Sequence, residues 1–161
     1  MSKRRARIMG VVALTMALGV LAGLPSLAQE SPPPIAAELL TGRASFTDDV
    51  DLKIKTKLDG AATNVINSKD PSRTVVARLT VQPGAQFPWH THPGPVIVNV
   101  VQGELVYVNA NDCVDRPYSA GTAFIDPGQG NVHTAFNPSE TDVTVLVATV
   151  VLRDDDSHDG P

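Results

Sequence analysis

The chain has 161 residues, of which 13 are Lys or Arg and 17 are Asp or Glu, so its formal net charge is −4 at pH 7. This length suits one domain with one hydrophobic core. The acidic balance argues against nucleic acid as a partner, because phosphate backbones are bound through an excess of basic side chains. The single cysteine, Cys113, excludes an intramolecular disulfide.

The first 28 residues have the pattern of a secretory signal peptide. Four basic residues between Lys3 and Arg7 precede an apolar run over 8–24, and small residues predict cleavage after Ala28. A membrane anchor is the alternative, but the apolar run is short and contains three glycines. Export by the twin-arginine pathway is a second alternative, which the residues after Arg4-Arg5 disfavour. Cleavage would leave nine basic residues against 17 acidic ones, a net charge of about −8. The mature protein would then be secreted or periplasmic and would have no membrane segment.

Residues 29–44 are predicted to be a proline-rich leader outside the core, with one short helix at most over 35–40. Strands are expected from residue 45 onward. Over 52–58, apolar residues alternate with lysines, the pattern of a half-buried strand. Further strands, separated by Gly- and Pro-rich turns, are predicted over 74–81, 96–101, 104–108, 123–126, 132–136 and 143–152. The strands over 96–101 and 104–108 are predicted to pair as a hairpin.

Many short strands without a convincing helix predict an all-β sandwich or a closed barrel over 45–152. Residues 153–161 form an acidic tail that contains His158, and this tail is predicted to be solvated and disordered.

Three of the four histidines lie in two short segments, at His90, His92 and His133. Residues i and i+2 of an extended strand point to the same side, so His90 and His92 can reach one point in space. His133, brought from another strand, would complete a metal site. A single histidine in a β protein is more often a hydrogen-bonded core or surface residue. Three of them in this arrangement favour metal binding.

The residues around these histidines resemble the two conserved motifs of the cupin superfamily. In the first motif, Gly84 and Gly103 flank the His90 and His92 pair. The second motif is matched in order by Gly121, Pro127, Gly130, His133 and Asn137. The resemblance covers residues 84–137 and implies a single jelly-roll β-barrel over 45–152, often dimeric, with a metal inside. Activities in this superfamily range from dioxygenase, isomerase and decarboxylase to plain ligand binding.

Two positions depart from the family pattern. The turn over 127–130 contains one extra residue, which a turn tolerates, and Val96 stands where the family has a glutamate ligand. Three neutral imidazoles would leave the charge of a divalent metal uncompensated and more coordination positions open. Glu104 and Asp126 are alternative carboxylates, although each lies beside a predicted turn.

The valines at 96, 98 and 100 would face inward and line an apolar cavity. Such a cavity favours a small hydrophobic or aromatic ligand over a sugar. By the same alternation, Trp89 and Phe136 are expected to face away from the metal.

The sequence therefore predicts a secreted single-domain cupin that binds a divalent transition metal through His90, His92 and His133. Iron, manganese, nickel, copper and zinc all remain open. As an enzyme it would carry out an oxygen-dependent reaction on a small organic substrate. The alternative is a non-catalytic cupin that binds a small molecule or a partner protein with weak or no metal, and a third hypothesis is metal buffering or storage. Edge strands would allow a homodimer.

Overall fold

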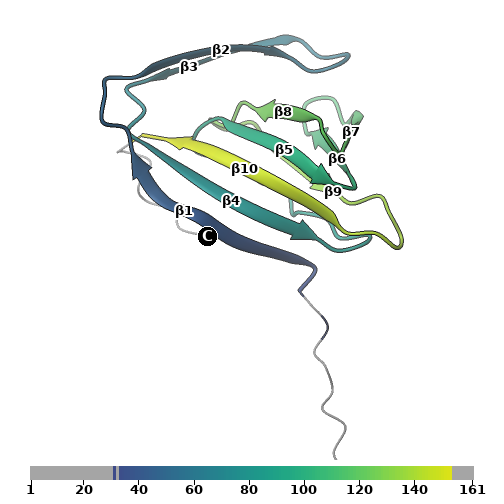
Figure 1. Cartoon of the computed structure of the whole chain (residues 1–161). Coiled ribbons are helices and arrows are strands. Elements are labelled where there is room, and N and C mark those ends of the chain that lie inside the picture. Colours follow the sequence, from purple (N-terminus) through teal and green to yellow (C-terminus); the bar gives the residue numbers. More distant parts are fainter. Residues whose placement is uncertain (1–30, 32, 154–161) are drawn as a thin grey trace, which may run out of the picture. The chain divides into compact units, whose positions relative to one another are not determined.

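A computed structural model describes residues 31 and 33–153 of the chain. The signal peptide predicted over 1–28 and the tail beyond Arg153 lie outside the described residues. The described part contains ten β-strands and no α-helix (Figure 1). The strands are β1 Ile35–Ser45, β2 Asp51–Lys57, β3 Thr63–Lys69, β4 Arg73–Val81, β5 Val96–Gln102, β6 Glu104–Asn109, β7 Asp115–Ser119, β8 Ala123–Asp126, β9 His133–Phe136 and β10 Thr144–Leu152. This part of the chain accordingly holds no helix long and apolar enough to cross a membrane.

Two antiparallel sheets enclose the core. One has five strands in the order β1-β4-β10-β5-β8, and the other has three in the order β7-β6-β9 (Figure 1). Buried side chains of the first sheet, such as Val98 and Leu146, share one apolar cluster with Leu105 and Tyr107 of the second. The prediction of an all-β jelly roll is confirmed.

Alternation along the strands decides which side chains enter this core. In β5, Val96, Val98 and Val100 are buried, whereas Ile97 and Val101 are exposed. Successive strand residues point to opposite faces, so a run of β-branched residues can fill the core on one face only. Each buried valine or leucine contributes about 1.5–3 kcal/mol to folding.

The predicted pairing of residues 96–101 with 104–108 as a hairpin is wrong. β5 pairs with β10 and β8, and β6 pairs with β7 and β9. The chain passes from one sheet to the other at Gly103, whose φ is +74° and which leaves no room for a Cβ beside Thr144. The pattern of the sequence marks this turn but does not say whether the strands that it joins are partners.

The prediction of a leader with a short helix over 35–40 is wrong as well. Residues 35–45 form β1, which pairs with β4 from Ile35 opposite Val81 to Ser45 opposite Arg73. Most side chains of β1 are exposed, so this edge strand is held by its backbone hydrogen bonds and adds little to the core. Since β1 has no buried face, its sequence lacks the alternation of apolar and polar residues that identifies a half-buried strand.

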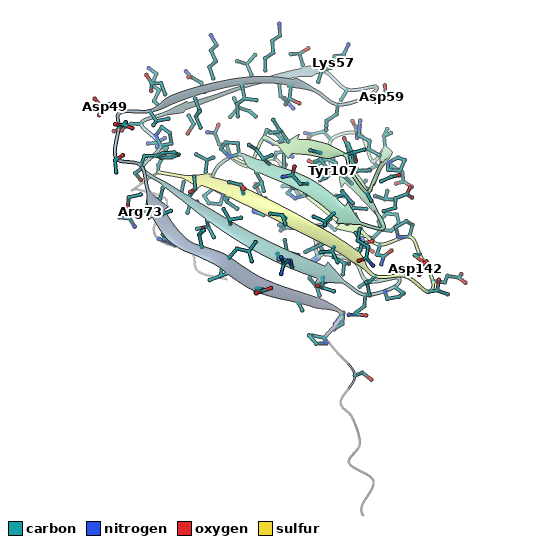
Figure 2. The ribbon with its side chains drawn as sticks, in the orientation of Figure 1. Asp49, Lys57, Asp59, Arg73, Tyr107 and Asp142 are labelled. Carbon is teal, nitrogen blue, oxygen red and sulfur yellow. The ribbon has the colours of Figure 1, made fainter. Side chains whose placement is uncertain are left out.

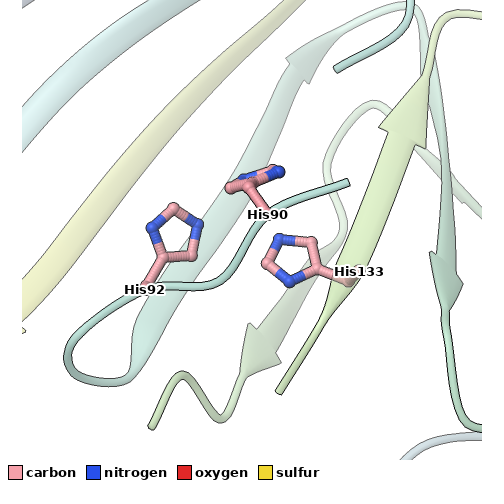
Figure 3. Close-up of side chains that lie close together, drawn as sticks. All are labelled: His90, His92 and His133. Atoms are coloured by element: carbon pink, nitrogen blue, oxygen red, sulfur yellow. The ribbon is translucent and has the colours of Figure 1, made fainter. Parts of the chain in front are cut away.

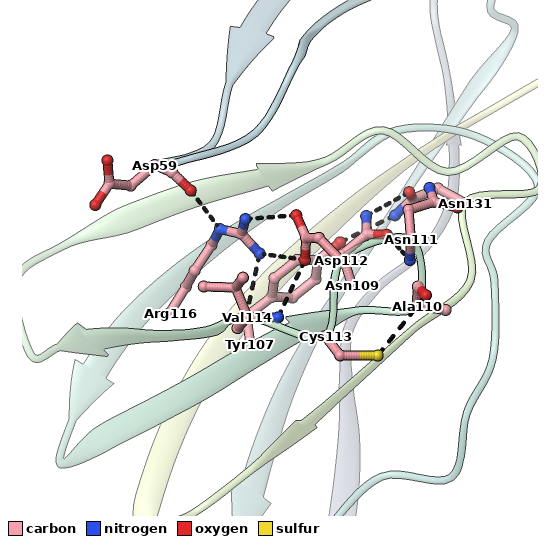
Figure 4. A network of polar contacts seen from close by, with 10 residues as sticks. All are labelled: Asp59, Tyr107, Asn109, Ala110, Asn111, Asp112, Cys113, Val114, Arg116 and Asn131. Atoms are coloured by element: carbon pink, nitrogen blue, oxygen red, sulfur yellow. Dashed lines mark hydrogen bonds and ion pairs between the residues drawn. The ribbon is translucent and has the colours of Figure 1, made fainter.

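The strand predicted over 52–58 is confirmed as β2, which pairs with β3 to form a separate hairpin. The lysines of β2 are exposed, as the alternation predicted, and Lys57 is labelled in Figure 2. At the turn of this hairpin, the carbonyl oxygen of Asp59 accepts a hydrogen bond of 3.0 Å from the buried guanidinium of Arg116 (Figure 4). Arg116 also binds both carboxylate oxygens of Asp112, at 3.1 and 2.7 Å.

Candidate metal centre

The three predicted histidines lie together. Each of His90, His92 and His133 offers one nitrogen, and these nitrogens all lie within 4.8 Å of one another (Figure 3). His90 and His92 belong to the segment between β4 and β5, and His133 is the first residue of β9. The structure thus brings together the residues that the sequence selected. That they bind a metal stays a prediction.

His90 and His133 are held by reciprocal backbone hydrogen bonds. The amide of each donates to the carbonyl oxygen of the other at 2.9 Å, which makes an isolated antiparallel bridge. The segment before His90 also lies along β9. The amide of Phe87 donates a hydrogen bond of 2.9 Å to the carbonyl oxygen of Ala135, and the hydroxyl of Thr134 donates one of 2.6 Å to the carbonyl oxygen of Phe87. His90 and His92 therefore do not lie in one regular strand. The bridge gives His90 the extended backbone that the prediction required.

His92 is held by the turn that carries the extra residue. The amide of Gln129 donates to the carbonyl oxygen of His92 at 2.8 Å. Gly128, Gln129 and Gly130 have φ values of +60°, +51° and +85°, so the turn is left-handed over three consecutive residues. Gly128 packs so closely on the backbone of Gly94 that a Cβ would overlap its carbonyl oxygen. The turn with the extra residue thus helps to hold the backbone of His92 in place.

Hydrogen bonds select the ring nitrogen that His90 and His133 keep free. His90 Nδ1 lies 2.7 Å from the carbonyl oxygen of Pro88. A carbonyl only accepts, so Nδ1 carries the hydrogen and Nε2 keeps its lone pair. His133 Nδ1 lies 3.3 Å from the carbonyl oxygen of Asn131 and 3.3 Å from Asp126 Oδ1, which leaves its Nε2 free in the same way.

Burial keeps two of the rings neutral. It lowers the pKa of His92 to about 4, against an opposing effect of the Asp126 charge, and the neighbouring His90 and His133 lower it further. Burial also lowers the pKa of His133, again against the Asp126 charge. Neutral imidazole is the form that binds a transition metal.

The histidines form part of the wall of an apolar cavity of about 180 Å³. Val96 and Val98 line it, as predicted, whereas Val100 is buried in the adjoining core. Trp89 is 51% exposed and does not line the cavity, so the expectation that it faces away is confirmed. Besides the histidines, the polar side chains of the lining are Tyr107 and Asp126.

Asp126 lies closer to the histidines than its position beside a predicted turn indicated. Its side chain lines the cavity and is only 1% exposed, while Glu104, the other alternative, lies outside the lining and accepts a hydrogen bond from Ser119. A signal was present, because Asp126 lies two residues after Phe124 and strand alternation places both side chains on one face. Asn137 has the structural role that was predicted, since its buried amide donates to three backbone carbonyl oxygens.

The fold and the site define a jelly-roll protein with a three-histidine centre beside an apolar cavity. The family model described as "Cupin domain" matches residues 77–149. This part of the chain belongs to the cupin superfamily.

Several solved structures are similar to this chain. KdgF from Halomonas sp. is 20% identical, with 79% of this chain and 87% of that chain covered and a TM-score of 0.49. A cupin-like protein from Thermotoga maritima is 25% identical, with coverages of 55% and 61% and a TM-score of 0.46. The polyketide cyclase RemF from Streptomyces resistomycificus is 18% identical, with 48% of this chain covered and a TM-score of 0.44, and the match spans only 54% of the RemF chain. No curated protein matches the chain in sequence.

Proposed function

We propose that this protein binds a divalent transition metal through His90, His92 and His133 and acts with it on a small organic molecule in the apolar cavity. The observation that carries the proposal is the convergence of three imidazole nitrogens, within 4.8 Å of one another, on the wall of that cavity. Three imidazole nitrogens directed at one point are a donor set found in transition-metal sites.

The donor set fits a transition metal. Imidazole suits iron, nickel, copper and zinc, and the Nε2 atoms of His90 and His133 are left free by the contacts of their Nδ1 atoms. A bound metal would supply a Lewis acid with open coordination positions, and iron would in addition supply chemistry with dioxygen. We infer an oxygen-dependent reaction because three protein ligands leave room for both a chelating substrate and dioxygen.

The lining of the cavity favours a substrate with an apolar body. Tyr107 Oη donates to Asp126 at 3.0 Å, so the two polar side chains beyond the histidines are engaged with each other. The hydroxyl groups of a sugar would find few partners there, and each buried hydroxyl left unpaired costs about 1–3 kcal/mol. The volume of about 180 Å³ limits the apolar body to a small molecule.

Elemental analysis by plasma mass spectrometry tests the metal. Protein purified without a chelator or an affinity tag is compared with His92→Ala, and Trp89→Ala serves as the control because Trp89 is half-exposed and outside the lining. We expect close to one metal per chain in the wild type and the control, and none in His92→Ala. A folded wild type that cannot be loaded with any of the five metals would refute metal binding.

Oxygen uptake tests the reaction. The loaded wild type is assayed with catechols, flavonols and small thiols, with His92→Ala and the metal-free protein as controls. We expect uptake that requires both the metal and one of these substrates. Uptake equal in all three preparations, or none with any substrate, would contradict an oxygenase.

Val96 favours a second candidate function, a non-catalytic cupin that binds its small molecule without a metal. Val96 lines the cavity where the family has a glutamate ligand, and a valine cannot coordinate. This candidate requires that His90→Ala leaves folding and ligand binding intact. A substantial loss of either would exclude it.

We also propose export of the protein, on the pattern of residues 1–28. Sequencing of the N-terminus of the protein recovered from outside the cell membrane is expected to start at Gln29. Recovery of the unprocessed chain in the cytoplasm would contradict export.

A further inference from the structure

A buried carboxylate faces the position from which the family glutamate is missing. Val96 of β5 and Asp126 of β8 are directly opposed in the antiparallel pairing of these strands. Both side chains line the cavity, so they lie on the same face of the sheet. Directly opposed residues have Cβ atoms about 4.5–5.5 Å apart, so a carboxylate at either position can act on the same site.

The Asp126 carboxylate is held by three hydrogen-bond donors. Tyr107 Oη donates to Oδ1 at 3.0 Å and Asn131 Nδ2 donates to Oδ1 at 2.7 Å. The amide of Gly128 donates to Oδ2 at 3.2 Å. All three partners donate, which is the pattern of an ionised carboxylate, and the group is only 1% exposed. Burying a charged group lowers the stability of the fold unless hydrogen-bond donors or an opposite charge compensate it. Three donors compensate Asp126 here, and a bound metal would add a positive charge nearby.

The remaining partner of this carboxylate is a candidate metal ligand. Asp126 Oδ1 lies 3.3 Å from His133 Nδ1, on the side of the ring opposite to the free Nε2. A carboxylate behind a histidine fixes the orientation and the tautomer of the ring and raises the basicity of the nitrogen that binds the metal. Tyr107 and Asn131 already occupy Oδ1, and Gly128 occupies Oδ2, so the carboxylate is held in place behind the ring.

We propose that Asp126 replaces the missing glutamate, as a positioning residue that supplies the negative charge of the metal centre through His133 without binding the metal itself. This inference rests on the proposed metal site. On this proposal the charge of the metal, which three neutral imidazoles alone would leave uncompensated, is partly balanced by Asp126. It also explains how the chain can carry Val96 and still bind a divalent ion.

The test is a titration with Co²⁺, followed by its visible absorption, of four proteins: the wild type, Asp126→Asn, Val96→Glu and the double variant. We expect Asp126→Asn to bind Co²⁺ about 10–100 times more weakly, the usual effect of removing such a partner. We expect the double variant to recover most of this loss, because the new glutamate brings a carboxylate back from the facing strand. Glu104→Gln is the matched control, since it removes the same charge outside the cavity and should change the affinity less than about twofold.

The melting temperature of each metal-free protein separates positioning from folding. A merely structural role would lower this temperature and leave the Co²⁺ affinity and absorption spectrum of the folded protein unchanged, which would overturn the inference. A folded double variant without any recovery would overturn it too. Should Asp126→Asn fail to fold, Tyr107→Phe combined with Asn131→Ala removes both donors to Oδ1, the oxygen that lies beside His133 Nδ1. An unchanged Co²⁺ affinity in that folded variant would also overturn the inference. A wild type that binds no Co²⁺, or binds it equally well as His92→Ala, would refute the proposed metal site itself.

Discussion

The turn that follows β8 offers a sharp test of how the backbone positions His92. An alanine at Gly128 would place a Cβ over the carbonyl oxygen of Gly94 and 3.1 Å from that of His92. An alanine at Gly130 meets no atom within 4 Å. Both glycines have positive φ, +60° and +85°, so the two substitutions share the backbone strain and differ in the overlap.

The magnitudes follow from these two contributions. A left-handed conformation costs an L-residue about 1–2 kcal/mol, which is the expected loss of unfolding free energy in Gly130→Ala. In Gly128→Ala the overlap adds about 1–3 kcal/mol, as overpacking does elsewhere, so the loss should reach about 2–5 kcal/mol. The overlap can be relieved only by moving the turn, and this movement disturbs the 2.8 Å hydrogen bond from Gln129 to His92. We therefore expect Gly128→Ala, but not Gly130→Ala, to weaken metal binding by roughly tenfold or more.

Urea denaturation of the metal-free proteins measures the stability, and titration with Co²⁺ measures the affinity. Equal losses of stability in the two variants would show that the turn is not packed tightly against Gly94. A Gly128→Ala protein that is destabilised but binds Co²⁺ like the wild type would refute the argument that this turn positions His92.

Three further predictions concern stability. Asn137→Ala should lower the unfolding free energy in urea by about 2–4 kcal/mol, because three hydrogen bonds from its buried amide to backbone carbonyl oxygens are lost; a loss below about 1 kcal/mol would contradict this role. The hydrogen bond from Arg116 lowers the pKa of Asp112 below its ordinary value of 3.8. The stabilisation of the fold by this ionised carboxylate is therefore complete above that pH and is lost as the pH falls through the lower pKa of the folded state. Denaturation at several pH values between about 6 and 2 should therefore show a weaker loss on acidification in Asp112→Asn than in the wild type, and identical profiles would contradict the linkage. Removal of the metal with a chelator should lower the melting temperature of the wild type by roughly 5–10 °C and leave that of His92→Ala unchanged, and a shift of equal size in both would argue against the site.

The strands that the sequence identified are those whose own residues alternate or fill the core. β5, β8 and β10 contain runs such as Val96 to Val101, which the core requires on one face at least. β1, β3 and β7 were missed, and each is a poor strand by composition. β7 contains Pro117, which only an edge strand tolerates, and β3 has a single large apolar residue on its buried face, Ile66. These strands form by pairing with a neighbour, β3 and β7 with the strand directly before each and β1 with the more distant β4. Their own residues lack the alternating apolar pattern by which a strand is recognised in the sequence.

The same distinction separates what could be predicted of the metal centre from what could not. His90 and His92 are two residues apart and belong to a spaced motif, so their convergence can be inferred along the chain, even though the structure places them on an irregular segment beside β9. Asp126 is significant only because β8 lies against β5 in the register that sets it opposite Val96. The sequence shows that a valine stands at position 96 in place of the glutamate. It does not show that β8 pairs with this part of β5 and sets Asp126 opposite Val96. A carboxylate can therefore move to the neighbouring strand and still act on the same histidines, which means that the missing family ligand is weak evidence against a functional metal site in this chain.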